Sequence, residues 1–217
     1  MTIKLVSNKI ETSPLFISEK RNNMTKKEII WREILFQAIE NKKIDFTQKE
    51  LAQKYGFSLS TVFNALKIPR ASNIIEGKRG LRVSDTEKLL YIWATFRKLK
   101  KDIIYQTAVS KDVFTIEGEM PPGVIFGGFS AFARKYGSPP ADYDKVYVYI
   151  AKNQLNEIKN RFPKQKGRPN LFILLADPFL KQFGQITPDC QTFADLWNVG
   201  DWYAKDFLQA LKEKIFA

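Results

Sequence analysis

Residues 47–67, TQKELAQKYGFSLSTVFNALK, decide the fold of the N-terminal part of this chain. Thr47 and Glu50 have the spacing of a capping box, in which a hydroxyl and a carboxylate bind free amides of the first helical turn. Gly56 is the residue type that ends a helix, because glycine adopts a left-handed backbone without strain. The stretch therefore predicts two short helices joined by a tight turn.

Two helices joined in this way form a helix-turn-helix when they can pack closely and leave a polar outer face. Ala52 permits the close approach. On the second helix, over residues 59–67, we expect apolar side chains inside and short polar ones outside. The inner set is Leu59, Val62, Phe63 and Leu66, and the outer set is Ser60, Thr61 and Asn64. A three-helix bundle without a ligand is the alternative that this pattern allows.

The flanking segments extend this unit to a winged helix-turn-helix over residues 25–102. Thr25 and Glu28 have capping-box spacing, and apolar residues recur at helical spacing behind them, which predicts a helix over residues 26–40. Residues 72–83 predict two short strands around a basic turn that contains glycine. A basic hairpin placed after a helix-turn-helix has the form of a wing.

The positive charge is concentrated in the same half of the chain. The net charge is +12; residues 20–111 hold 20 Lys or Arg against 9 Asp or Glu, whereas residues 112–217 hold 13 against 12. A basic module beside a neutral one is typical of a nucleic-acid-binding domain joined to another domain, and a solubilising surface is the alternative. A further helix over residues 85–100 is expected to turn Phe96 inward and to extend the positive charge with Arg97, Lys98, Lys100 and Lys101.

These patterns predict a DNA-binding surface. The second helix would lie in the major groove and read bases with Ser60, Thr61 and Asn64. Lys78, Arg79 and Arg82 on the wing would bind phosphates, which adds affinity without sequence information. The complete predicted set is Ser58, Ser60, Thr61, Asn64, Lys67, Lys78, Arg79 and Arg82.

Beyond residue 102 the helical period gives way to alternating strands and helices, which predicts a small α/β domain over residues 103–217. We expect strands at 124–126, 145–150 and 171–176, and helices at 128–136, 153–162, 191–197 and 201–216. Residues 1–24 lack a sustained period and are expected to form an N-terminal arm. The predicted fold class is α+β.

Three stretches resemble the AbiEi-like antitoxins of type IV toxin-antitoxin systems and their winged-helix relatives. They are residues 82–94 (RVSDTEKLLYIWA), 127–137 (GGFSAFARKYG) and 188–197 (PDCQTFADLW). The resemblance implies a winged helix-turn-helix joined to a domain related to the nucleotidyltransferase fold, in a degenerate form. It also implies a transcriptional regulator that binds its own promoter, with a nucleotidyltransferase toxin or its RNA target as a further partner.

An enzyme is the alternative. Gly127-Gly128 followed by Asp142-Tyr143-Asp144 imitates the nucleotidyltransferase pattern, in which a glycine turn cradles a triphosphate and two carboxylates hold divalent ions. However, Lys145 takes a position that is usually apolar, the two aspartates precede the predicted strand, and the candidate third carboxylate, Asp177, is not identified by any spacing. We therefore expect a regulator without catalytic activity.

The amino-acid composition excludes several kinds of site. Cys190 is the only cysteine and the chain has no histidine, which excludes internal disulfides, cysteine zinc clusters and histidine-dependent acyl transfer. We expect no cofactor and no metal. No apolar run is long enough for a membrane helix and the start does not resemble a signal peptide, so a cytoplasmic location is expected. The oligomeric state stays open, with a dimer on DNA as one option.

Overall fold

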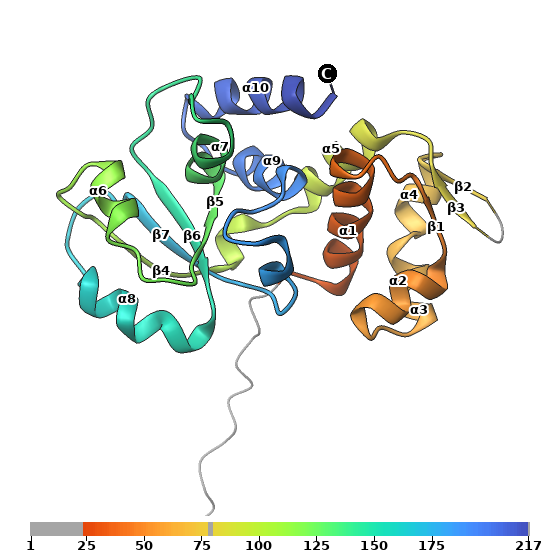
Figure 1. Cartoon of the computed structure of the whole chain (residues 1–217), viewed down its shortest axis with the longest axis horizontal. Helices are drawn as coiled ribbons and strands as arrows, with labels where there is room; N and C mark the ends of the chain where they lie inside the picture. Colours follow the sequence, from red (N-terminus) through yellow and green to blue (C-terminus); the bar gives the residue numbers. More distant parts are fainter. Residues whose placement is uncertain (1–23, 78–79, 217) are drawn as a thin grey trace, which may run out of the picture.

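A computed structural model describes residues 24–77 and 80–216 as a mixed α+β protein with two small sheets (Figure 1). The elements of the first half are α1 (Lys26–Glu40), β1 (Asp45–Phe46), α2 (Gln48–Tyr55), α3 (Leu59–Ala65), α4 (Lys67–Ala71), β2 (Ile75–Glu76), β3 (Leu81–Val83) and α5 (Thr86–Phe96). Those that follow are the single-turn helix η1 (Leu99–Lys101), β4 (Ile103–Thr107), α6 (Val113–Gly118), β5 (Ile125–Gly127), α7 (Gly128–Tyr136), β6 (Val146–Ile150), η2 (Lys152–Gln154), α8 (Leu155–Arg161), β7 (Leu171–Leu175), η3 (Leu180–Phe183), α9 (Asp189–Trp197) and α10 (Ala204–Phe216).

The helix ends of the N-terminal half follow the predicted local signals. Thr25 and Glu28 form the expected capping box at the start of α1. The Thr47 side chain accepts a hydrogen bond from the Glu50 amide at the start of α2. Gly56 ends that helix with φ 64°, in the left-handed region that glycine adopts without strain. The predicted helix over 26–40 and the short helix before Gly56 are therefore confirmed.

The first sheet is antiparallel and has the strand order β1-β3-β2. β1 lies between α1 and α2 in the sequence, yet Asp45 pairs with Arg82 of β3. β2 and β3 form a hairpin that projects at the right-hand end of the molecule in Figure 1. Lys78 and Arg79, which were predicted at its turn, lie outside the described residues.

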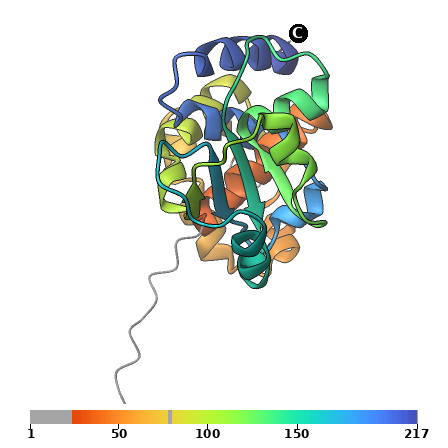
Figure 2. The same cartoon turned by 90° about the vertical axis from the view of Figure 1, so that its left-hand side faces the viewer.

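The second sheet has the strand order β4-β7-β6-β5, with β6 and β7 parallel and the outer pairs antiparallel. Successive side chains point to opposite faces of a strand. Accordingly, Val146 and Val148 of β6 belong to a core with Ile116 of α6 and Ile158 of α8. Tyr149 belongs instead to the core beneath α7, α9 and α10. The sheet thus separates two helical layers (Figure 2).

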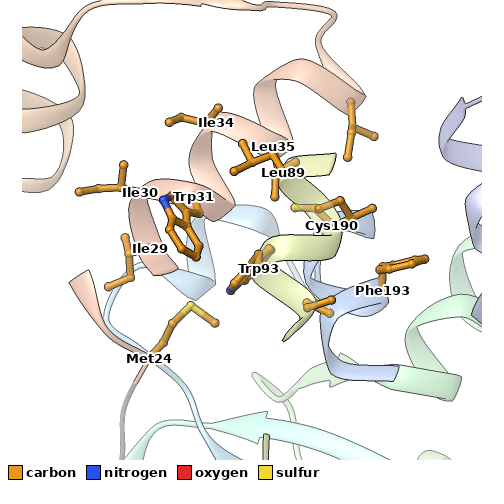
Figure 3. Packing of buried hydrophobic residues seen from close by; sticks show 14 of the residues in the cluster. Met24, Ile29, Ile30, Trp31, Ile34, Leu35, Leu89, Trp93, Cys190 and Phe193 are labelled. Atoms are coloured by element: carbon orange, nitrogen blue, oxygen red, sulfur yellow. The ribbon is translucent and has the colours of Figure 1, made fainter. Parts of the chain in front are cut away.

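One hydrophobic core connects the two halves of the chain. Trp31 of α1, Leu89 and Trp93 of α5, and Cys190 and Phe193 of α9 all belong to the same cluster of buried residues (Figure 3). The packing is therefore continuous across the predicted domain boundary at residues 102 and 103. Residues 1–23 of the predicted arm lie outside the described residues.

Several elements differ from the sequence prediction. α5 ends at Phe96 instead of Lys100, because Arg97 has an extended backbone with φ −60° and ψ 134°. Phe96 was expected inside, but it is 43% exposed because it lies in the last turn of the shortened helix. The strand β4 and the short helices α4 and α6 were not predicted. None of the helices within residues 24–77 and 80–216 is long and apolar enough to cross a membrane.

Candidate nucleic-acid interface

Helix α3 is held against α1 by its inner face. Val62 and Ala65 are buried, and the Trp31 indole of α1 donates a hydrogen bond to the Ala65 carbonyl oxygen at 2.8 Å. This bond satisfies a carbonyl in the last turn of α3, where helical partners are missing. The contact fixes which side of α3 is turned outward.

The outward side is less polar than the sequence indicated. Ser60, Asn64 and Lys67 are exposed as predicted, and Thr61 is half-buried. Leu59 and Phe63 were expected inside but are 57% and 48% exposed, so that part of the prediction is wrong. A helix of seven residues has room for only a narrow buried stripe, and Val62, Ala65 and the following Leu66 fill it.

The hydroxyls at the start of α3 form a local cluster. The Ser58 hydroxyl accepts a hydrogen bond from the Thr61 amide at 3.2 Å and lies 2.9 Å from the hydroxyls of both Ser60 and Thr61. Ser58 is therefore the N-cap of α3, and capping is its structural role. A ligand at Ser60 or Thr61 would compete with this cluster.

Asn64 differs from these hydroxyls because its side-chain amide has no hydrogen-bond partner among the described residues. It stands one turn after Ser60. Beside it, the Lys67 ammonium and the Arg70 guanidinium lie 5.7 and 5.5 Å from the centre of the Phe63 ring. The exposed side of α3 thus combines a free amide, an aromatic ring and two cations.

Arg82 adds a further cation on β3. Its side chain is 63% exposed and lies 3.9 Å from Asp45, at the edge of ion-pair distance. So exposed a pair contributes little to stability, and the guanidinium is available to an anion. Of the predicted wing cations, Arg82 is the one that the described residues include.

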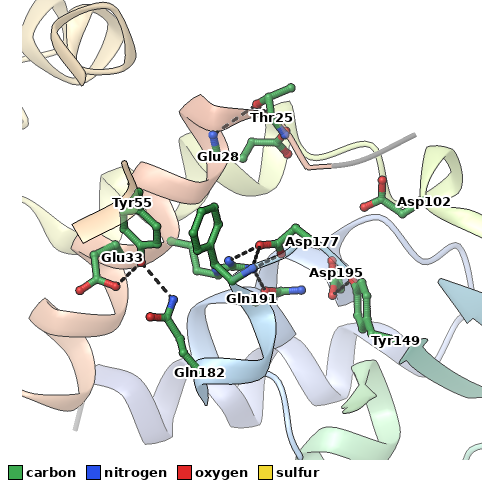
Figure 4. A network of polar contacts seen from close by, with 12 residues as sticks. Thr25, Glu28, Glu33, Tyr55, Asp102, Tyr149, Asp177, Gln182, Gln191 and Asp195 are labelled. Carbon is green, nitrogen blue, oxygen red and sulfur yellow. Dashed lines mark hydrogen bonds and ion pairs between the residues drawn. The ribbon is translucent and has the colours of Figure 1, made fainter. Parts of the chain in front are cut away.

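Arg97 does not extend the positive surface as predicted. It is 2% exposed, and its guanidinium bonds Asp102 at 2.6 Å, Asp195 at 2.8 Å and the Tyr149 hydroxyl at 3.0 Å. Burial alone would lower the pKa of Arg97, but these neighbours raise it well above its ordinary value. Two of these partners, Asp195 and Tyr149, lie side by side in Figure 4. Lys98, Lys100 and Lys101 remain exposed.

The carboxylates considered for metal binding are mostly engaged. Asp177 forms a two-bond ion pair with Arg32, at 2.6 and 2.8 Å, and is therefore not free to bind a metal (Figure 4). Asp144 accepts a hydrogen bond from the Tyr203 hydroxyl, and Lys145 pairs with Asp201. Among the described residues, no three His, Cys, Asp or Glu side chains are grouped as metal ligands.

Comparisons of this chain with protein-family models, with curated proteins and with solved structures found no match.

Proposed function

We propose that this protein is a regulator that binds double-stranded DNA in a sequence-specific manner. In this proposal α3 lies in the major groove and the β2–β3 hairpin lies along the adjacent phosphates. The observation that carries it is the exposed side of α3, where the Asn64 amide is unpartnered among the described residues and two cations lie over the ring of the neighbouring Phe63.

The order of the elements supports the proposal. A helix, a short strand, two helices at a tight turn, the short helix α4 and a hairpin follow one another from α1 to β3, and the three strands form one sheet in the order β1-β3-β2. In a winged helix-turn-helix the second helix of the pair meets the bases and the hairpin flanks it. Here α3 and the hairpin lie toward the same end of the molecule (Figure 1).

The chemistry of the exposed side chains suits base recognition. An asparagine amide can bond the N6 and N7 atoms of adenine at the same time, and an aromatic side chain can contact the methyl group of thymine. Asn64 and Phe63 supply these two groups next to each other. Lys67 and Arg82 are exposed and would contact phosphates, and the net charge of residues 20–111 favours association with DNA.

The test begins with selection of preferred duplexes from a random pool, followed by anisotropy titrations with the full chain. Asn64→Ala should lose about 1–3 kcal/mol of discrimination at one base position while its affinity for unrelated DNA is kept. Lys67→Ala should weaken binding to all duplexes and lower the salt slope by about one. Lys205→Ala removes the same charge from an exposed position on α10 and should change neither quantity.

No duplex binding at low salt, or an equal effect of Lys67→Ala and Lys205→Ala, would contradict the proposal. The antitoxin role and the toxin or RNA partner that the resemblance implies stay predictions. So does the expected absence of catalysis by Asp142 and Asp144, which a nucleotide-transfer assay of Asp144→Asn with magnesium would test.

A further inference from the structure

A pocket of about 840 Å³ opens beside the second sheet, away from α3 and the hairpin. Its walls come from η1, β4, the first residues of β6 and β7, and residues 198–201 after α9. The volume lies within the range of roughly 300–1,000 Å³ that small-molecule sites occupy. None of the predicted DNA-contacting residues that the structure describes lines it.

Aromatic rings form one wall of the pocket. The rings of Tyr147 and Phe172 stack with their centres 4.7 Å apart and their planes within 9°. Leu99 of η1 and Ile103 of β4 add apolar surface. A flat ring would gain stacking and apolar contacts on such a wall.

The Tyr147 hydroxyl at the pocket wall has no hydrogen-bond partner among the described residues. Tyr147 as a whole is 7% exposed. Burial raises the pKa of Tyr147, and the nearby Asp201 carboxylate raises it further. The hydroxyl therefore keeps its proton. The hydroxyl itself remains accessible from the pocket, so it can donate a hydrogen bond to a ligand there.

The charged lining is positive. Asp201 pairs with Lys145 and also with Arg168, at 3.3 Å, so one carboxylate is shared by two cations. Lys100 and Lys164 line the pocket as well. Lys164 also donates to the Gln106 carbonyl oxygen, which holds its ammonium at this place. An anion would therefore be attracted into the pocket.

We propose that this pocket binds a nucleoside phosphate. The base would lie against Phe172 and Tyr147, and the phosphate would meet Lys100 and Lys164. A nucleoside phosphate joins a flat base to an anion. The aromatic wall would stack on the base, the Tyr147 hydroxyl would donate a hydrogen bond to it, and the lysines would attract the phosphate. The inference does not depend on DNA binding, because it concerns different residues.

Isothermal titration of the full chain with AMP, GMP, CMP and UMP tests the proposal. We expect at least one of them to bind more than about tenfold more tightly than its nucleoside, ribose 5-phosphate or inorganic phosphate, since each of those lacks one of the two recognised parts. No binding by any of the four would overturn the proposal. Equal binding of inorganic phosphate would overturn it too, because it would indicate attraction of anions alone.

Two variants locate the binding site. Tyr147→Phe removes only the hydroxyl and should weaken binding by about threefold to tenfold, the usual worth of one hydrogen bond. Lys100→Ala changes an exposed side chain and should weaken binding of the nucleotide more than binding of the nucleoside. Lys205→Ala, exposed on α10, should bind as the wild type does, and near-ultraviolet circular dichroism checks that all three keep the native fold. Unchanged affinity in both Tyr147→Phe and Lys100→Ala would place the ligand elsewhere and refute the assignment.

Discussion

Arg32 and Arg97 are the most deeply buried cations among the described residues, at 0% and 2% exposure. Each meets carboxylates from the other half of the chain, Asp177 for Arg32 and Asp195 for Arg97. A buried charge is tolerated only when it is paired and hydrogen-bonded. These two arginines therefore count toward the net charge of the N-terminal half but add no positive charge to its surface.

Asp102 gives this buried network a pH dependence. Burial raises the pKa of Asp102 from 3.8 to about 6, against the opposing effect of Arg97. The folded protein thus holds this proton more tightly than the unfolded chain. The stability from this group is complete below pH 4 and is lost as the pH rises through about 6. A shift of this size corresponds to about 3 kcal/mol.

Urea unfolding between pH 4 and pH 7 checks this prediction. The wild type should lose more unfolding free energy with rising pH than Asp102→Asn, because the variant has no proton to release. Asp112 provides a control of opposite sign, since hydrogen bonds from Thr115 lower the pKa of this exposed carboxyl. Asp112→Asn should leave the profile between pH 4 and pH 7 nearly unchanged and should flatten only its extension below pH 4, where this carboxyl takes up its proton. Parallel curves for the wild type and Asp102→Asn would refute the assignment.

Among the elements, the β2–β3 hairpin depends on the close approach of two glycines. Gly77 has φ 97°, and a Cβ atom added there would lie 2.5 Å from the Gly80 carbonyl oxygen. Gly56 also has a positive φ, 64°, but a Cβ atom added there would meet nothing within 4 Å. A residue with a Cβ atom would be strained at both positions, and the two positions differ in the space available for that atom.

Alanine at these two glycines should therefore have unequal effects. Gly56→Ala should cost about 1–2 kcal/mol of unfolding free energy from backbone strain alone. Gly77→Ala should cost more, because it adds a collision with the facing strand, and it should also weaken DNA binding if the hairpin serves as a wing. Urea unfolding and duplex titration measure the two effects. A Gly77→Ala variant as stable as Gly56→Ala would show that the hairpin does not close in this way.

In the whole molecule, the shared core and the ion pairs make the two halves depend on each other. The Arg32 and Asp177 pair joins α1 to the segment after β7, at a separation of 145 residues in the sequence, and Gln191 of α9 accepts a further bond from Arg32 at 2.9 Å. Asp177 also accepts a bond from the Phe179 amide, at 3.0 Å. Removing only its charge would leave the Arg32 cation buried and unpaired.

Asp177→Asn should cost about 3–5 kcal/mol of unfolding free energy, the usual penalty for a buried charge that loses its partner. The amide oxygen of Asn can still accept from Phe179, so the loss reports mainly on the charge. Adding Arg32→Met should recover much of the stability, because no uncompensated cation remains. Thermal and urea unfolding of the single and double variants measure this; a double variant less stable than Asp177→Asn would contradict the explanation.

The sequence by itself determined the elements that depend on neighbouring residues. The caps at Thr25 and Thr47, the left-handed end at Gly56 and most strands and helices of the second half follow from local hydrogen bonds and periodicity. The exposure of Ser60 and Asn64 followed from the same periodicity. These interactions join residues three or four positions apart, so they can be predicted from the sequence alone.

Only the tertiary structure decided which charged and aromatic side chains are exposed and which are buried. Arg97 had the appearance of a surface cation, but it is buried by Asp195, 98 residues later. Phe63 had the appearance of a core residue, but α1 leaves space for only one narrow stripe of α3. In the sequence, Tyr147 is one residue of an alternating strand. In the folded protein, Phe172 and the loop after α9 form a pocket around it. Burial and pairing depend on partners brought together by folding, and no periodicity in the sequence carries that information.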